Sequence, residues 1–198
     1  MTTANKITIV RILLVPFFIG SVIYYARSGQ PGFRLAALFS FALASVADGV
    51  DGYVARRFNQ RSELGAILDP LADKLLLTSA IILFSLDNRP YFERIPLWLT
   101  ITVLGRDAIT LLGMGLIHHF VGHVKVTARI PGKIATFLFM AAVLWILLRW
   151  DARVLPYLFV AIGALTALSA VLYILDGVQQ LNSHPVSAPA PSQQSNRN

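Results

Sequence analysis

The chain has 198 residues, of which 56% are hydrophobic and only 14% are charged. This composition is too apolar for an ordinary soluble domain and predicts one bundle of membrane-spanning helices. The lack of cysteine excludes disulfides and thiolate metal sites. The formal net charge of +7 comes without a basic run or an aromatic platform, so it argues against nucleic acid as a partner and favours an anionic membrane surface and phosphorylated substrates.

Six apolar runs are each close to the roughly 20 residues needed to cross a bilayer core. They predict an all-α integral membrane bundle of six transmembrane helices, at residues 7–26, 33–55, 64–86, 96–117, 132–149 and 155–176. The first run is expected to remain as a spanning helix, because Arg11 and Pro16 interrupt it and no small-residue cleavage site precedes Arg27. Residues 1–180 are predicted to form the membrane domain, and residues 181–198 a disordered polar tail.

Polar residues recur every three positions at the start of the first predicted span. They are Asn5, Thr8 and Arg11, and this interval places them on one arc of a helix. One interpretation is that Asn5 or Thr8 caps the helix while Arg11 extends its guanidinium group to the lipid headgroups. The other interpretation is contact with a substrate, and the residues of this arc alone favour neither.

Four aspartates, out of ten acidic residues in the chain, lie within residues 47–74, where the second apolar run ends and the third begins. They form two pairs, three and four positions apart, and each pair projects from one helix face: Asp48 with Asp51, and Asp69 with Asp73. The polar segment 57–64 is short enough to make the two helices antiparallel neighbours, so that all four carboxylates can meet. Such a cluster must be partly protonated or must hold cations. Oxygen-only ligands favour Mg²⁺, Mn²⁺ or Ca²⁺, and two ions are plausible.

Written as a pattern, this stretch is Asp48-x-x-Asp51-Gly52-x-x-Ala55-Arg56, eight residues, then Gly65-x-x-x-Asp69-x-x-x-Asp73. It resembles the signature of the CDP-alcohol phosphotransferases, and every fixed position of that signature is present. The resemblance implies an integral membrane enzyme that moves a substituted phosphoryl group from a CDP-linked donor to an alcohol and releases CMP. Family precedent also implies a homodimer.

The resemblance implies a role for each residue of the pattern. The four aspartates would hold two Mg²⁺ or Mn²⁺ ions, and Asp73 would also act as the general base. The CDP-linked donor would contact the remaining motif positions and the start of the first span, namely Gly52, Ala55, Arg56, Gly65, Asn5 and Thr8. Tight helix packing is a second role for the small residues of this set, and both roles can hold together.

The resemblance leaves two acceptors open. Asn5-x-x-Thr8-x-x-Arg11 resembles the N-terminal pattern of the phosphatidylglycerophosphate synthases within the family, which favours CDP-diacylglycerol as donor and glycerol 3-phosphate as acceptor. Arg106-Asp107 in the fourth span departs from the Arg-Glu of those enzymes and looks closer to the cardiolipin synthases. Phosphatidylglycerol therefore remains the alternative acceptor.

Basic residues in the second half of the chain are candidates for holding the acceptor. Arg106 either forms an internal ion pair with Asp107 or, as the resemblance suggests, contacts the acceptor. Basic residues every four positions form either a wall for a phosphate or a positive-inside signal: Lys125, Arg129 and Lys133. The predicted acceptor-binding set is Arg11, Arg106, Lys125, Arg129 and Lys133. Lys74, directly after the motif, is expected to be structural, balancing the acidic cluster or reaching a neighbouring loop.

The distribution of Lys and Arg predicts the orientation of the chain. With a cytoplasmic N-terminus, the cytoplasmic side collects eight of these residues and the opposite side six. The aspartate motif then faces the cytoplasm, at a bacterial inner membrane. Intramembrane carboxylates also mark cation or proton transporters, but those acids are expected near the bilayer midplane and often within a repeat, whereas here they lie at helix ends.

Overall fold

The structure is a computed structural model that describes residues 3–58, 63–86, 90–121 and 130–183, and gives the backbone alone at residues 3–8, 48–58, 63–73, 114–121, 177 and 179–183. Every regular element within these ranges is a helix, which confirms the all-α class. The elements are α1 (Thr3–Ser28), α2 (Pro31–Phe58), α3 (Glu63–Ser85), α4 (Leu97–Val121), α5 (Ile130–Leu148), a short 3-10 helix η1 (Ala152–Val154) and α6 (Leu155–Ser183).

Each of the six predicted spans lies on one α-helix, but the helices differ in how well they suit a membrane. In the described part of the chain, three segments are long and apolar enough to cross a bilayer: Ile9–Ser28, Ile130–Leu148 and Ala152–Asp176. Shorter apolar segments cover Pro31–Ala47 and Lys74–Ser85. These two segments end where the described side chains end, at residue 47 in α2 and from residue 74 on in α3. The number of spans therefore stays a prediction.

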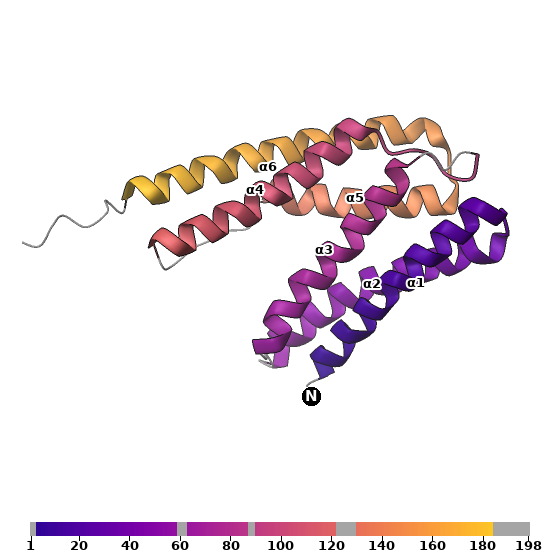
Figure 1. The fold of residues 1–198 in the computed structure, drawn as a ribbon, viewed down its shortest axis with the longest axis horizontal. Helices are drawn as coiled ribbons and strands as arrows, with labels where there is room; N and C mark the ends of the chain where they lie inside the picture. Colours follow the sequence, from indigo (N-terminus) through magenta and orange to yellow (C-terminus); the bar gives the residue numbers. More distant parts are fainter. Residues whose placement is uncertain (1–2, 59–62, 87–89, 122–129, 184–198) are drawn as a thin grey trace, which may run out of the picture.

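The helices run back and forth along one direction (Figure 1). The α1–α2, α3–α4 and α5–α6 connections lie together at one end of the molecule, and α1 to α3 bring the N-terminus and the α2–α3 junction to the other. Toward that second end, α1 to α3 diverge from α4 and α6. The backbone of the aspartate motif thus lies where the helices splay apart.

The first three helices pack around a seam of large side chains. On α1, Val15, Phe18, Val22 and Tyr25 alternate by three and four positions and are all at most 5% exposed. The Phe18 ring lies 5.4 Å from that of Phe41 on α2, and this spacing is typical of aromatic pairs worth about 0.5–1.5 kcal/mol beyond their buried area. This seam fixes the rotation of α1 against α2 and α3.

Backbone and side-chain contacts hold the connections at the end of the molecule where α1 meets α2 and α3 meets α4. Gly29 ends α1 with a φ of 67°, and its N–H donates to the Tyr25 carbonyl at 2.9 Å, as at many helix C-termini. In the α3–α4 connection, the Ile95 N–H donates to the Phe84 carbonyl at 2.8 Å, and Arg94 Nε donates to the Ser85 carbonyl at 2.8 Å. These bonds fold the connection back against the end of α3.

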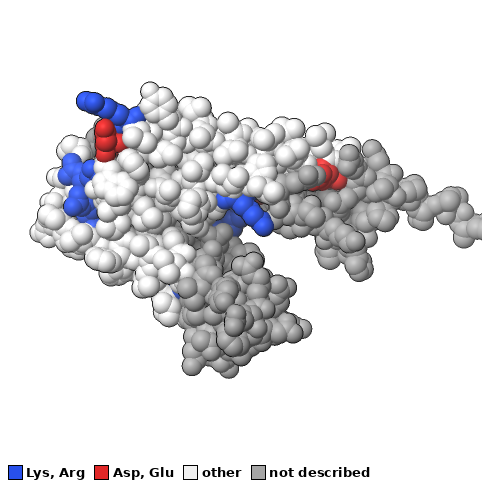
Figure 2. All heavy atoms as spheres, turned by 180° about the vertical axis from the view of Figure 1, so that it is seen from behind, with Lys and Arg blue, Asp and Glu red and all other residues white. Residues whose placement is uncertain are grey.

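Large apolar side chains cover the outside of the bundle as well as its core. Phe39, Ile101 and Phe137 are 69%, 70% and 71% exposed, on three different helices. Figure 2 shows a broad surface with few charged side chains along the described helices, and several Lys and Arg side chains gathered at the end of the α1–α2, α3–α4 and α5–α6 connections. An apolar surface of this extent would be unstable in water and suits the lipid of a bilayer. The protein is therefore an integral membrane protein.

Candidate active site

The motif occupies two consecutive helices. Positions 48 and 51 lie in α2, and positions 69 and 73 lie in α3. The two helices contact each other, and only residues 59–62 separate their ends. The side chains of the four aspartates lie outside the part of the chain whose side chains the structure describes, so their meeting at one metal site stays a prediction.

Helical register places the four positions on stripes of α2 and α3 that are buried farther along each helix. On α2, Ala37, Phe41 and Ala44 are each fully buried, and positions 48 and 51 continue the same alternation of four and three residues. On α3, the buried side chains of Leu76 and Ala80 form the stripe that positions 73 and 69 extend toward the helix start. Both pairs thus belong to the stripes that face the interior of the bundle farther along each helix.

Arg11 is fully buried in the protein, with none of its surface exposed. It continues the α1 seam one turn before Val15, and α1 packs against both α2 and α3. The interpretation in which Arg11 extends to the headgroups is therefore wrong, because an arginine that does so keeps its guanidinium in contact with water or lipid headgroups. A buried guanidinium group in a membrane bundle needs hydrogen-bond or ion-pair partners. This end of α1 is therefore a polar part of the interior.

The remaining predicted site residues are only partly described. Asn5 and Thr8 lie in α1, Gly52, Ala55 and Arg56 in α2, and Gly65 in α3, and for these only the backbone is known. Lys125 and Arg129 lie outside the described residues. Lys133 is exposed near the start of α5. Their assignments to donor and acceptor therefore stay predictions.

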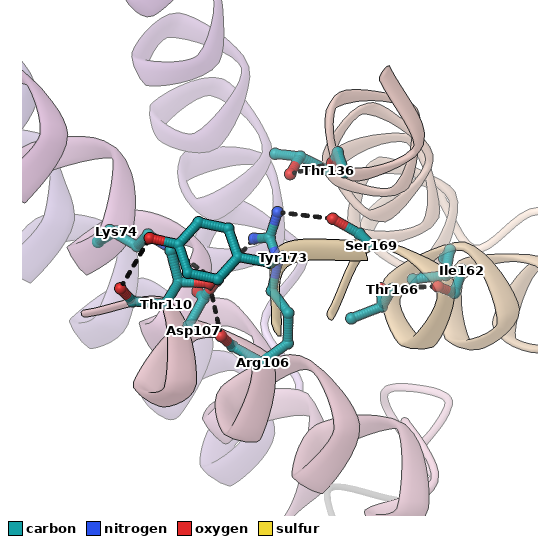
Figure 3. Close-up of polar contacts among 10 residues, drawn as sticks. Lys74, Arg106, Asp107, Thr110, Thr136, Ile162, Thr166, Ser169 and Tyr173 are labelled. Atoms are coloured by element: carbon teal, nitrogen blue, oxygen red, sulfur yellow. Dashed lines mark hydrogen bonds and ion pairs between the residues drawn. The ribbon is translucent and has the colours of Figure 1, made fainter. Parts of the chain in front are cut away.

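An ion cluster lies next to the motif, where α3 faces α4 (Figure 3). Lys74 Nζ on α3 lies 2.5 Å from Asp107 Oδ1 on α4, and Arg106 Nη1 donates to the same oxygen at 2.8 Å. Lys74 therefore pairs with a carboxylate of the fourth helix, and its structural role stays a prediction. The predicted Arg106–Asp107 ion pair is confirmed. Contact between Arg106 and an acceptor remains a prediction.

The cluster extends from α4 to α5 and α6. Arg106 Nη2 donates to Ser169 Oγ on α6 at 3.4 Å. Gly132 at the start of α5 leaves room for both groups, because a Cβ there would lie 2.5 Å from Nη2 and 2.7 Å from Oγ. Thr110 lies one turn after Arg106 on α4, and its carbonyl accepts from the Tyr173 hydroxyl of α6 at 3.4 Å. Polar contacts therefore tie α4 to its neighbours at the level of the motif.

The cluster lines a cavity of about 50 Å³ between α3, α4, α5 and α6. Its lining includes polar side chains from Lys74, Thr78, Asp107 and Thr136 as well as apolar ones. A polar cavity needs about 10–15 Å³ to hold one water molecule, so this one has room for a few. Water there would reduce the cost of placing three charged groups within the bundle.

Sequence patterns did not indicate Ser169 or Gly132 as partners of Arg106. Ser169 is a lone hydroxyl in an apolar helix, and such residues usually bond their own helix backbone. Gly132 carries no side chain that could suggest a contact. A charged residue inside a span does predict that some polar partner exists. Only the packing of α4 against α5 and α6 shows which partner it is.

A metal site is not visible among the described side chains. In that part of the chain, no three His, Cys, Asp or Glu side chains lie together in a group that could hold an ion. The motif aspartates are not among them. The donor set of the motif nevertheless fits a hard divalent ion, because four carboxylate positions lie on two contacting helices of one end of the bundle.

Comparison with known proteins gives a family match over most of the chain. Residues 1–175 match the family model described as CDP-alcohol phosphatidyltransferase. The CDP-diacylglycerol–glycerol-3-phosphate 3-phosphatidyltransferase of Bacillus subtilis is 36% identical over 153 residues, covering 73% of this chain and 76% of that protein. The enzyme of the same name from Escherichia coli is 31% identical over 171 residues, covering 85% and 90%.

A cardiolipin synthase (CMP-forming) from Streptomyces coelicolor is also similar. It is 36% identical over 142 residues, covering 72% of this chain. The aligned part spans 63% of the length of that synthase. These relatives are thus named for two different reactions, and percentage identity alone does not separate them.

Proposed function

The chain belongs to the CDP-alcohol phosphatidyltransferase family, and we propose that it transfers the phosphatidyl group of CDP-diacylglycerol to glycerol 3-phosphate, giving phosphatidylglycerophosphate and CMP. The observation that carries this choice of acceptor is the extent of similarity to the relatives named for that reaction. The match to the Escherichia coli enzyme covers 85% of this chain, against 72% for the match to the cardiolipin synthase. Asn5, Thr8 and Arg11 on one arc of α1 add support from the sequence.

In the proposed reaction, the acceptor hydroxyl attacks the β-phosphorus of CDP-diacylglycerol in a direct displacement. Asp73 takes the proton of that hydroxyl as general base. A new ester bond forms from the acceptor oxygen to phosphorus, and the bond from phosphorus to the CMP oxygen breaks. CMP departs with the electron pair of that bond. Arg56 has the donor geometry to bind phosphate oxygens of the donor.

Asp48, Asp51, Asp69 and Asp73 are the proposed ligands for two Mg²⁺ or Mn²⁺ ions. Bound divalent ions would supply charge neutralisation for the pyrophosphate and the leaving CMP. The carboxylates are suited to this because oxygen ligands are those that hard cations prefer. Their place at helix ends would let a water-soluble acceptor enter while the acyl chains of the donor stay in lipid.

The acceptor would be held by cationic side chains. Arg11 is buried at the motif end of α1, and Arg106 lies on the other side of α3. Lys125, Arg129 and Lys133 are proposed to contribute from the α4–α5 connection and the start of α5. We further propose a bacterial inner-membrane location, an active site on the cytoplasmic side, and a homodimer.

The test uses purified protein in detergent with Mg²⁺ and radiolabelled CDP-diacylglycerol, and offers glycerol 3-phosphate and phosphatidylglycerol in separate reactions. Phosphatidylglycerophosphate is the expected lipid product. A lipid product formed from phosphatidylglycerol alone would instead establish the cardiolipin synthase reaction, which Asp107 and the Streptomyces coelicolor relative favour. Asp73→Asn is expected to abolish turnover and largely preserve donor binding; normal turnover would exclude Asp73 as the base.

A further inference from the structure

Asp107 is the point at which the motif helix is joined to the second half of the bundle. Its Oδ1 atom accepts from Lys74 of α3 at 2.5 Å and from Arg106 of α4 at 2.8 Å. The Asp107 side chain is only 18% exposed, and Arg106 is 24% exposed. Two cations therefore share one largely buried carboxylate oxygen. One of them, Lys74, directly follows the last aspartate of the motif.

The two faces of α3 serve different neighbours. Positions 69 and 73 share a stripe with the buried Leu76 and Ala80. Lys74 belongs to a different stripe, which lines the cavity toward α4, α5 and α6. Successive residues of an α-helix are about 100° apart, so fixing the direction of Lys74 also fixes the direction of position 73.

The α4 side of this contact is itself held in place. The guanidinium group of Arg106 donates to Asp107 through Nη1 and to Ser169 of α6 through Nη2. It also packs over Gly132 of α5, where a side chain would displace it. Asp107 thus has a fixed position relative to α4, α5 and α6. Its carboxylate provides a fixed partner for the side chain of Lys74.

We propose that Asp107 is a positioning residue, which holds Lys74 and thereby sets the rotation of α3 about its own axis, and with it the place of backbone position 73 relative to the reacting groups. This inference rests on the proposed function, since it assigns Asp107 a purpose in that reaction. It differs from a direct role of Lys74 in substrate binding. In a direct role, Lys74 acts on a ligand and loss of Asp107 leaves it free to do so; in the positioning role, loss of either partner has the same effect.

The kinetic test compares Asp107→Asn, Lys74→Met and the double variant. Each single variant is expected to lower kcat by about 10- to 100-fold, the cost of a small misplacement of a catalytic group, with a much smaller change in KM for glycerol 3-phosphate. The double variant should lose no more than the worse single variant. Asp107→Glu, which keeps the charge, should recover part of the rate.

Asp151→Asn is the matched control. Asp151 is an exposed aspartate beyond the far end of α5, and it accepts from the Arg153 N–H. Asparagine can make the same cap, so kcat should be unchanged in this variant. Losses that multiply in the Lys74/Asp107 double variant, or a change confined to acceptor KM, would overturn the proposal.

A distance measurement tests the same idea without relying on catalysis. The chain has no cysteine, so paired spin labels can be placed at Ile82 on α3 and Ile101 on α4, which are 45% and 70% exposed. The labelled protein should give one narrow distance distribution, and both Asp107→Asn and Lys74→Met should broaden or shift it. An unchanged distribution in folded variants overturns the proposal, even if no alcohol proves to be an acceptor. Should Asp107→Asn not fold, Lys74→Met alone decides.

Discussion

Gly132→Ala is the substitution that most directly perturbs the ion cluster without removing a charged group. Gly132 is buried at the start of α5, facing Arg106 and Ser169. The added methyl group would lie 2.5 Å from Arg106 Nη2 and 2.7 Å from Ser169 Oγ. Ordinary contacts need about 3.5 Å, so the end of the arginine side chain must move by roughly 1 Å.

That movement would break the bond from Nη2 to Ser169 Oγ, which is already long at 3.4 Å. A hydrogen bond to a charged group contributes about 1.5–3 kcal/mol, and the length of this one places it at the low end. Alanine in place of glycine returns about 0.5–1 kcal/mol through lower backbone entropy of the unfolded chain. The expected net loss in free energy of unfolding is therefore small, about 1 kcal/mol.

The effect on activity should be larger than the effect on stability. Because Arg106 and Lys74 share Asp107, a displaced guanidinium changes the contact that orients α3, and kcat is expected to fall by about 10-fold or more. The assay is CMP release at saturating donor, together with thermal unfolding in detergent. Gly20→Ala is the control, since nothing lies within 4 Å of a Cβ at Gly20. Equal rates in the two variants would refute the reasoning.

Three further substitutions test other parts of the fold. Gly163→Ala on α6 would place a methyl group against the Trp98 ring of α4 and should lower the unfolding temperature by overpacking, at a cost of about 1–3 kcal/mol; an unchanged temperature would mean that α4 and α6 are not packed this closely. Gly29→Ala must adopt a positive φ and would meet Tyr91 Oη at 2.7 Å, so thermal unfolding should show a loss of at least about 1 kcal/mol. Arg11→Met is expected to raise KM for a phosphorylated substrate by about 10-fold or more, because a hydrogen bond to a charge is lost. A lower unfolding temperature at constant KM would mean that Arg11 stabilises the fold and does not bind substrate.

The sequence predicted the helices well because long apolar runs have few other stable arrangements in a membrane. It also predicted the motif positions that lie on α2 and α3, since spacing within one helix follows from its pitch. The neighbours of Arg106 could not be predicted in this way. Ser169 and Gly132 lie on other helices, and only their packing brings them to α4.

Two residues lie in surroundings that the sequence alone did not indicate. Arg11 lies near the end of an apolar run, a position from which arginine commonly reaches the headgroups. In the fold it continues the seam of α1 and is fully buried. Lys74 was expected to meet the acidic cluster or a loop, and it meets Asp107 because α3 presents two different faces to two groups of helices.

We propose that this chain catalyses phosphatidyl transfer from CDP-diacylglycerol. The most direct measurement is the release of labelled CMP by purified protein with Mg²⁺ and glycerol 3-phosphate, with the lipid product counted in the same reaction. The account predicts one molecule of phosphatidylglycerophosphate for each CMP, and no release when the divalent ion is chelated. Folded protein that releases no CMP with any alcohol acceptor would contradict it.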